Sequence, residues 1–307
     1  MQLSAKTRNF LRRMRKNWVL YAMLLLPLAY IIIFKYVPMY GAQIAFRDYK
    51  LTKGITESLW VGLKHFDKFI NGRMFSRLLT NTLRITMYSL ATFPCSIVFA
   101  FMLNYMPFKR FRKAVSIVSY APHFISTVVI CGIILNFFSS FGMINQFRGL
   151  FGLEAINFLS EAELFAGLYV WTGVWQGVGY GSIIYVSALS GVDNELHEAA
   201  IIDGATILKR VWHIDLPGIL PMVMVMLVLR CGSLLSVGYE KVYLLQNTLN
   251  TTHSEVISTY VWKQGISAST PQYDYASAVG LFTSVVNLIM LVTVNWISRR
   301  MTSHSIW

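Results

Sequence analysis

Charged residues are scarce in this sequence. Only 13% of the 307 residues are Asp, Glu, Lys or Arg, whereas 55% are hydrophobic. Soluble domains usually carry about 25% charged residues. The composition therefore argues against an ordinary soluble domain and indicates a membrane protein.

Cysteine is also rare, and the three cysteines, Cys95, Cys131 and Cys231, lie scattered in apolar stretches. This spacing excludes a disulfide framework and a cysteine-based metal site. The six histidines are isolated, with no H-E-x-x-H motif, so no metal site is predicted. The sequence also lacks a phosphate-cradling G-x-x-x-x-G-K-[ST] motif and a catalytic constellation. We therefore expect a non-catalytic chain that binds no cofactor of its own.

The charge that is present is mostly basic, with 27 Lys and Arg residues against 14 Asp and Glu residues. In a soluble protein such an excess would suggest a nucleic-acid partner. Here the basic residues cluster beside apolar runs, where they orient a membrane protein. No zinc-finger or RNA-binding signature accompanies them. The expected surroundings are a lipid bilayer, with no nucleic acid.

Six apolar stretches approach the length of about 20 residues that a membrane-spanning helix needs. They predict spans at 18-38, 83-105, 115-138, 164-188, 217-238 and 276-297. Arg230 interrupts the fifth stretch and would cost roughly 2.5–3.5 kcal/mol at the centre of a span, which the apolar residues around it can offset. The predicted fold class is all-α, a polytopic membrane protein of six transmembrane helices in one domain over residues 18-298.

Basic residues near the first spans set the predicted orientation. Six precede Trp18 and four lie in residues 109–113, and neither cluster contains an acidic residue. Such clusters are typical of the cytoplasmic side. The first apolar stretch is long and no A-x-A cleavage site follows it, so it is interpreted as an uncleaved span. With six spans, the N-terminus at 1-17, the C-terminus at 299-307 and the loop after the fourth span are all expected in the cytoplasm.

That loop, residues 193-217, contains residues with clear local roles. Asp193 can cap a short helix, and Glu198 places negative charge early in it, where the helix dipole favours a carboxylate. The small Ala199 and Ala200 would let a partner surface approach the helix backbone. Gly204 permits a sharp reversal.

A second short helix, over residues 209–212, would then fold back toward the membrane. Pro217 would start the fifth span, a position at which its missing N–H is harmless. The predicted element is a stiff helix–turn–helix joined to a transmembrane helix.

The whole pattern is E-A-A-x3-G-x9-I-x-L-P, and it resembles the cytoplasmic EAA loop of binding-protein-dependent ABC importer permeases. The resemblance implies that this loop is a coupling helix docking on a separate ATPase. It further implies that Glu198 pairs with a basic group there and that Gly204 holds the helix angle. The loop residues are Glu198, Ala199, Ala200, Asp203, Gly204, Ile214, Leu216 and Pro217. An amphipathic helix on the membrane surface is the alternative, but it explains neither the alanine pair nor the glycine.

Other stretches narrow the resemblance to LplB-type permeases of the carbohydrate-uptake class over essentially the whole chain. These stretches are Pro38-Met39-Tyr40-Gly41, Ala45-Phe46-Arg47-Asp48-Tyr49, Trp60-Val61-Gly62-Leu63, Asn81-Thr82-Leu83, residues 237–247, residues 255–261, residues 295–300 and the terminal Ser305-Ile306-Trp307.

The resemblance implies a type I ABC importer permease in a bacterial plasma membrane. It implies as partners a second homologous permease, a dimer of nucleotide-binding ATPase subunits that uses ATP and Mg, a lipid-anchored extracellular solute-binding protein and an oligosaccharide substrate.

Aromatic and polar residues of the fourth and fifth spans are candidates for the substrate pathway, because sugars stack on aromatic faces and hydrogen-bond to convergent polar groups. The candidates are Trp171, Trp175, Gln176, Tyr180, Arg230, Tyr239, Glu240, Tyr243 and Asn247. A helix–helix seam with aromatics facing lipid would give a similar pattern. Arg230 could pair with Glu240 or face the pathway, and the sequence leaves both open.

Two other classes of protein are weighed against the importer permease. A secondary transporter or channel would be expected to show inverted repeats and paired discontinuous helices, and neither is detected. An intramembrane enzyme would need clustered acids, histidines or a nucleophile motif.

Overall fold

The computed structural model describes residues 16–302, and this part of the chain is built mainly from helices. Two short strands, β1 (Arg47–Lys50) and β2 (Ser58–Trp60), form an antiparallel pair that aligns Arg47 with Trp60. The helices are α2 (Trp18–Ile31), α3 (Val37–Met39), α4 (Gly54–Glu57), α5 (Lys64–Ile70), α6 (Phe75–Ala91), α7 (Pro94–Asn104), α8 (Lys109–Tyr120), α9 (Thr127–Phe137), α10 (Met143–Leu150), α11 (Phe165–Leu189), α12 (Asn194–Ile202), α13 (Ile207–Arg210), α14 (Leu216–Cys231), α15 (Tyr239–Leu245), α16 (Thr251–Ser254), α17 (Ile257–Trp262) and α18 (Tyr273–Thr302), with 3-10 turns η2 (Tyr40–Phe46), η3 (Ala121–Phe124) and η4 (Ala162–Leu164) and π turns η1 (Ile32–Tyr36), η5 (Val211–Asp215) and η6 (Lys263–Ser267).

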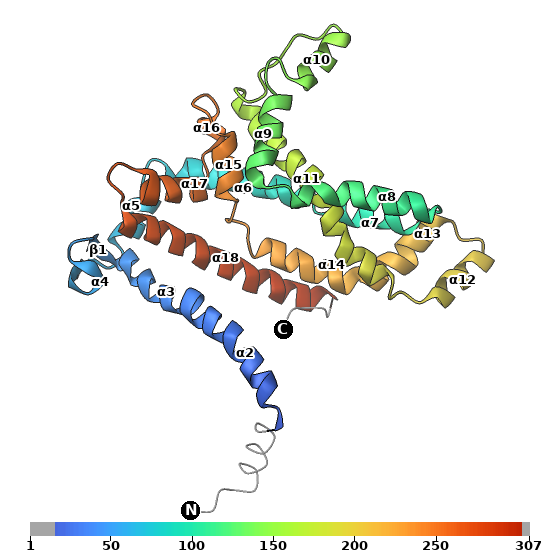
Figure 1. The fold of residues 1–307 in the computed structure, drawn as a ribbon, viewed down its shortest axis with the longest axis horizontal. Helices are drawn as coiled ribbons and strands as arrows, with labels where there is room; N and C mark the ends of the chain where they lie inside the picture. Colours follow the sequence, from blue (N-terminus) through green and yellow to red (C-terminus); the bar gives the residue numbers. More distant parts are fainter. Residues whose placement is uncertain (1–15, 303–307) are drawn as a thin grey trace, which may run out of the picture.

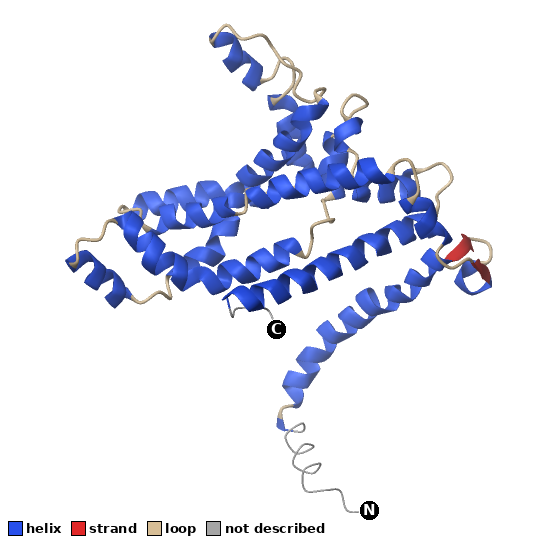
Figure 2. Ribbon diagram, turned by 180° about the vertical axis from the view of Figure 1, so that it is seen from behind, coloured by secondary structure: helices blue, strands red, loops and turns tan. Residues whose placement is uncertain are grey.

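The first apolar stretch forms one helical rod, Trp18–Phe46, which stands apart from the rest of the molecule (Figures 1 and 2). No residue of α2 is buried, although its side chains are almost all apolar. Contact with the bundle is made at the far end, where η2 packs on α18. The rod therefore presents its hydrophobic surface to the surroundings and not to this chain's own core.

The bundle is held together along α11, which packs against α6, α7, α8 and α14. One apolar cluster joins Ile97 of α7, Tyr185 and Leu189 of α11, and Ile219 of α14. A Cβ on Gly179 would overlap the carbonyl oxygen of Ser119, so glycine is needed for the close approach of α11 and α8. Gly179 therefore lies in a helix–helix contact, which is the alternative that the sequence analysis gave for the fourth span.

The stretch predicted as a third span, 115-138, is not one straight helix. Its first part, Lys109–Phe124, and its second part, Thr127–Phe137, meet at an angle of 102°. Pro122 ends the first part in a 3-10 turn, and Ile125 and Ser126 have extended backbones. The Ser126 hydroxyl accepts a hydrogen bond from the Val129 N–H and so caps the new helix. The bend thus follows from local chemistry that hydropathy alone does not register.

The fifth predicted span, 217-238, also differs from the structure. The helix begins at Ile207 and continues through η5 and α14 to Cys231. The second short helix, α13, does follow the turn at Gly204, and Pro217 lies in the first turn of α14. The difference is that α13, η5 and α14 run on as one helix without a break. The π turn η5 widens the helix just before Pro217, where the proline ring would otherwise clash with the preceding turn. The helix ends at Cys231, before the predicted end at residue 238.

By length and composition, the described residues hold four helices able to cross a membrane, or five if the bent pair counts as one span. These are Trp18–Phe46, Phe75–Asn104, Ile207–Cys231 and Tyr273–Arg300, with the bent pair as the fifth. Helix α11 has 25 residues but is not among them, because Gly, Tyr, Trp and Gln residues lower its mean hydropathy. The count of six spans and the cytoplasmic termini remain predictions.

Candidate functional site

The loop at 193-217 begins with a capped helix at one end of the bundle (Figure 1). The carboxylate of Asp193 accepts a hydrogen bond from the Glu195 N–H at 2.9 Å, so Asp193 caps α12 as the sequence predicts. Helix α12 buries none of its residues. Glu198 and Ala199 are exposed, and Ala200 is half-buried. The Glu-Ala-Ala face is therefore open to a partner.

Gly204 ends α12 with a φ of +74°, in the left-handed region that favours glycine. The Ala205 N–H donates to the Ala200 carbonyl across this turn at 2.8 Å. Asp203, just before it, is exposed. The chain then reverses into the helix that starts at Ile207, so the sharp turn predicted at Gly204 is present.

The second half of the motif lies at the base of the loop. Ile214 and Leu216 are half-buried and Pro217 is exposed. Asp215, the variable position between Ile214 and Leu216, is 1% exposed. A buried carboxylate here was not anticipated, because the motif leaves this position unspecified.

Asp215 connects three segments of the chain. Its Oδ2 accepts a hydrogen bond from the Tyr105 hydroxyl at 2.5 Å, just beyond the end of α7. Its Oδ1 lies 3.2 Å from Nε2 of His197 on α12, an ion pair when the imidazole is protonated. Burial and this hydrogen bond raise the pKa of Tyr105 to about 12, so the hydroxyl remains a donor at physiological pH. The guanidinium of Arg210 lies over the Tyr105 ring at 5.4 Å. Asp215 thereby fixes the base of the loop to the end of α7, and α12 joins this cluster when His197 is protonated.

Asp215→Ala is expected to lower the free energy of unfolding by about 1.5–3 kcal/mol, because the hydrogen bond from Tyr105 goes to a buried charged group. Asp203→Ala is the matched control: this carboxylate is exposed, and its loss should change stability by no more than about 0.5 kcal/mol. Thermal unfolding of the purified full chain in detergent measures both. Equal effects of the two substitutions would contradict the anchoring role of Asp215.

A cavity of about 850 Å³ opens between α6, α7, α11, α14 and α15, and it contains three of the predicted pathway residues. Gln176, Tyr180 and Arg230 all line it. The ring of Tyr180 stacks on that of His123 at 3.8 Å, beside the bend between α8 and α9. Polar groups of widely separated segments thus converge on one hollow of the bundle.

The other predicted aromatic residues do not line this cavity. The Trp171 indole N–H donates to the Tyr88 hydroxyl at 2.6 Å, and Trp175 is about half exposed. Tyr239 and Tyr243 pack on Trp262 with ring centroids 6.2 and 4.5 Å apart. Tyr239 lines a second, mainly apolar cavity of about 670 Å³ between α17 and α18. The structure therefore does not bring the predicted pathway residues together as one set.

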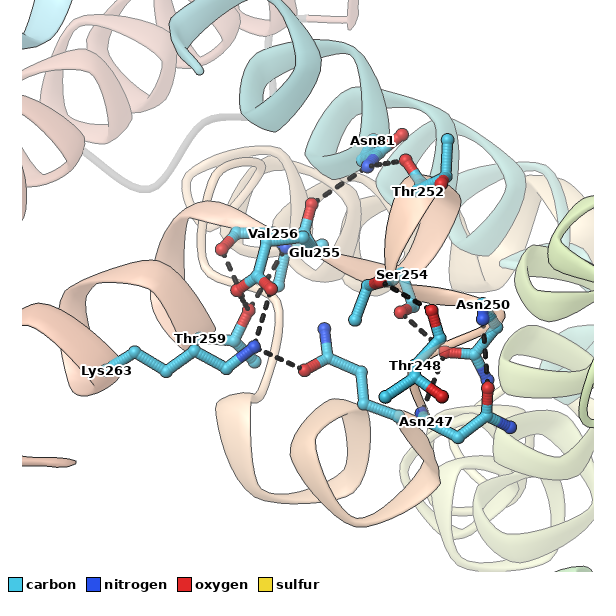
Figure 3. Close-up of polar contacts among 12 residues, drawn as sticks. Asn81, Asn247, Thr248, Asn250, Thr252, Ser254, Glu255, Val256, Thr259 and Lys263 are labelled. Atoms are coloured by element: carbon cyan, nitrogen blue, oxygen red, sulfur yellow. Dashed lines mark hydrogen bonds and ion pairs between the residues drawn. The ribbon is translucent and has the colours of Figure 1, made fainter. Parts of the chain in front are cut away.

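Asn247 belongs to a network of polar contacts around α16 (Figure 3) and lines neither of the two cavities described above. Its side-chain N–H group donates to the Leu159 carbonyl at 2.7 Å, and Asn250 donates to the same carbonyl at 2.9 Å. Nearby, the Lys263 ammonium lies 2.6 Å from the buried carboxylate of Glu255. These contacts fix the backbone of residues 246–263, so the amide of Asn247 has a structural role.

Arg230 does not pair with Glu240 in the described part of the chain. Its guanidinium donates to the Ser89 hydroxyl at 2.6 Å and to the Ser89 carbonyl at 3.3 Å, while Glu240 is exposed. The cavity also contains Lys241, which the sequence analysis missed. The available signal was a lysine directly before the apolar residues Val242–Leu245.

Comparison with known proteins agrees with this arrangement. Residues 69–303 match the family model of the binding-protein-dependent transport system inner membrane component. The chain is 39% identical to the protein LplB of Bacillus subtilis over 295 residues, covering 95% of this chain and 92% of LplB. It is 38% identical to the polygalacturonan/rhamnogalacturonan transport system permease YteP of the same organism, covering 98% and 94% of the two chains.

A solved structure extends the comparison. A chain of a bacterial ABC transporter involved in the import of the acidic polysaccharide alginate superposes with a TM-score of 0.87 at 36% identity, covering 96% of this chain and 99% of that one. A second structure of the alginate transporter, with an alginate pentasaccharide-bound periplasmic protein, matches equally well. The chain therefore belongs to the binding-protein-dependent transport system inner membrane components, and it is a multi-pass, non-catalytic permease of a sugar-importing ABC transporter.

Proposed function

We propose that this permease moves an oligosaccharide across the membrane and is driven by a separate ATPase through residues 193-217. The main observation that supports this proposal is the structure of that loop. An exposed Glu-Ala-Ala helix ends at a left-handed Gly204, and the buried Asp215 fixes the base of the loop to the end of α7. A rigid lever of this kind can pass a movement of a docked partner into α7 and α14.

The partner at this loop is an ATPase dimer that uses ATP and Mg, since the permease sequence has no phosphate-binding motif of its own. On this proposal the loop and both termini are cytoplasmic. ATP binding closes the ATPase pair, the loop moves with it, and the helices switch between outward and inward access.

A second permease completes the membrane part in this proposal. The support is the rod Trp18–Phe46, whose apolar window has no buried residues within the chain. A helix exposed on all sides packs naturally against helices of a neighbouring subunit. The rod would be covered in such a pair.

An extracellular solute-binding protein delivers the substrate in this proposal. The similar alginate transporter was solved with a periplasmic protein carrying a pentasaccharide, and YteP is named for polysaccharide transport. These facts concern the relatives, and they support an oligosaccharide as the cargo here.

The test is reconstitution in liposomes of the complete complex that co-purifies with the full chain. Oligosaccharide uptake should require ATP and Mg on the side of the liposome membrane where the ATPase lies. Uptake should stop when the ATPase is omitted. A secondary transporter or channel predicts the opposite result. Uptake by this chain alone, without an ATPase, would refute the coupling proposal.

A further inference from the structure

Two cations face the 850 Å³ cavity, and none of the residues that line it is acidic. Arg230 comes from the last turn of α14 and Lys241 from α15. The Lys241 ammonium donates to the Tyr169 carbonyl at 3.1 Å and lies 4.9 Å from the centroid of the Tyr169 ring. Tyr169 itself lines the same cavity. The contacts of both cations are with neutral groups.

Two other cations of the bundle are neutralised by carboxylates, whereas Arg77 also donates to a neutral carbonyl. Arg84 pairs with Glu163 at 2.9 Å, and Lys263 pairs with Glu255 at 2.6 Å. Within the part of the chain that the structure describes, Arg230 and Lys241 make no ion pair with a carboxylate. Glu240 follows Tyr239 on the same short helix as Lys241, but it is exposed and does not line the cavity.

An unpaired charge inside a membrane protein is expensive unless it meets water or an opposite charge. Two such charges of the same sign at one cavity also repel each other. Lys241 is half-buried and Arg230 is exposed, so an anion in the cavity would offset the desolvation of the lysine and the repulsion between the two cations. A guanidinium fork also matches a planar carboxylate in two parallel hydrogen bonds.

The cavity has room and neutral partners for the remainder of a sugar. Gln176 and Tyr180 offer an amide and a hydroxyl for sugar hydroxyl groups. A Cβ at Gly173 would lie 3.6 Å from the Lys241 Nζ, an ordinary van der Waals contact, so the ammonium lies close to this part of α11. At Gly177 a Cβ would meet no atom within 4 Å.

We propose that Arg230 and Lys241 form a carboxylate-binding site on the translocation pathway, and that the transported oligosaccharide carries uronic-acid residues. This inference rests on the proposed import of an oligosaccharide and specifies its chemical class. A neutral oligosaccharide would make neither of these charge contacts. The site would therefore discriminate between acidic and neutral oligosaccharides of equal length.

The experiment measures ATP-dependent uptake of three probes by the complete transporter in liposomes: trigalacturonate, its fully methyl-esterified form and maltotriose. Trigalacturonate is expected to be taken up by the wild type. Arg230→Gln and Lys241→Gln should each lower its uptake at least tenfold, and should change uptake of the methyl ester less than about threefold. The methyl ester removes the charges but keeps the sugar backbone, and all variants share one solute-binding protein, so the change reports on the permease.

Two kinds of control variant accompany these substitutions. Lys64→Gln removes an exposed cation outside the cavity and should leave uptake of every probe unchanged. Arg230→Lys and Lys241→Arg keep the charge and should retain most of the uptake of trigalacturonate. This result would show that the glutamine variants lose recognition of the carboxylate and are not simply misfolded.

The outcomes are distinguishable. Equal effects of the glutamine variants on trigalacturonate and its ester, or no effect on either, would overturn the carboxylate site while import stands. Wild-type uptake of maltotriose or the methyl ester but not of trigalacturonate would overturn it as well. No ATP-dependent uptake of any probe would count against the proposed function and this inference together.

Discussion

Gly204→Val is expected to abolish sugar uptake while leaving the protein inserted in the membrane. Gly204 has a φ of +74°, and a β-branched residue in that region is strained by about 1–3 kcal/mol. A Cβ at Gly204 would meet no atom within 4 Å, so the defect is one of backbone conformation and not of steric overlap. The strain is relieved by a change in the direction of α12, which would misplace the face that docks on the ATPase.

Gly204→Asn is the matched control, because asparagine tolerates the left-handed conformation far better than valine. It should retain a large part of the uptake although its side chain is as large. Uptake and ATP hydrolysis by the reconstituted transporter measure both variants. If asparagine were as harmful as valine, the requirement would be for a small side chain at the docking surface, and the conformational argument would fail.

Local chemistry explains which parts of the loop could be predicted from the sequence. Asp193 before a helix and Gly204 after it are strong signals for a cap and a reversal, because both act within a few residues along the chain. The structure confirms both features. The family resemblance came from the same short-range pattern, and the family match bears it out.

The remaining features depend on contacts between distant residues. The hydrogen bond from Tyr105 to Asp215 joins positions 110 residues apart, and no pattern within the loop indicates it. The same holds for Lys241, which lines the same cavity as Arg230 and donates a hydrogen bond to the carbonyl of Tyr169, 72 residues away in the sequence. Hydropathy found the apolar stretches, but it registered neither the 102° bend after Phe124 nor the π turn before Pro217. These are set by backbone hydrogen bonding, to which a mean over many residues is insensitive.

Glu198→Lys is the second substitution expected to abolish uptake. Glu198 lies in α12 and is exposed, and its carboxylate makes no hydrogen bond or ion pair within the described part of the chain. Its carboxylate is therefore free to meet a basic group of the ATPase. Reversing the charge replaces an attraction with a like-charge contact, a change worth several kcal/mol at an interface. Such a change corresponds to a loss of roughly a hundredfold or more in binding.

Two further variants show whether the charge of Glu198 acts at this interface. Glu198→Gln removes only the attraction and should give an intermediate loss. Glu154→Lys is an equal reversal at an exposed position shortly after α10, a helix that lies away from α12 (Figure 1), and it should have little effect. Co-purification of the ATPase with each variant, compared with uptake, measures docking separately from transport. Salt screens the attraction between the wild-type Glu198 carboxylate and the ATPase. The difference in docking between the wild type and Glu198→Gln should therefore become smaller as the salt concentration rises. Normal uptake by Glu198→Lys with the ATPase still bound would mean that the exposed Glu-Ala-Ala helix does not form the contact through which the transporter is driven.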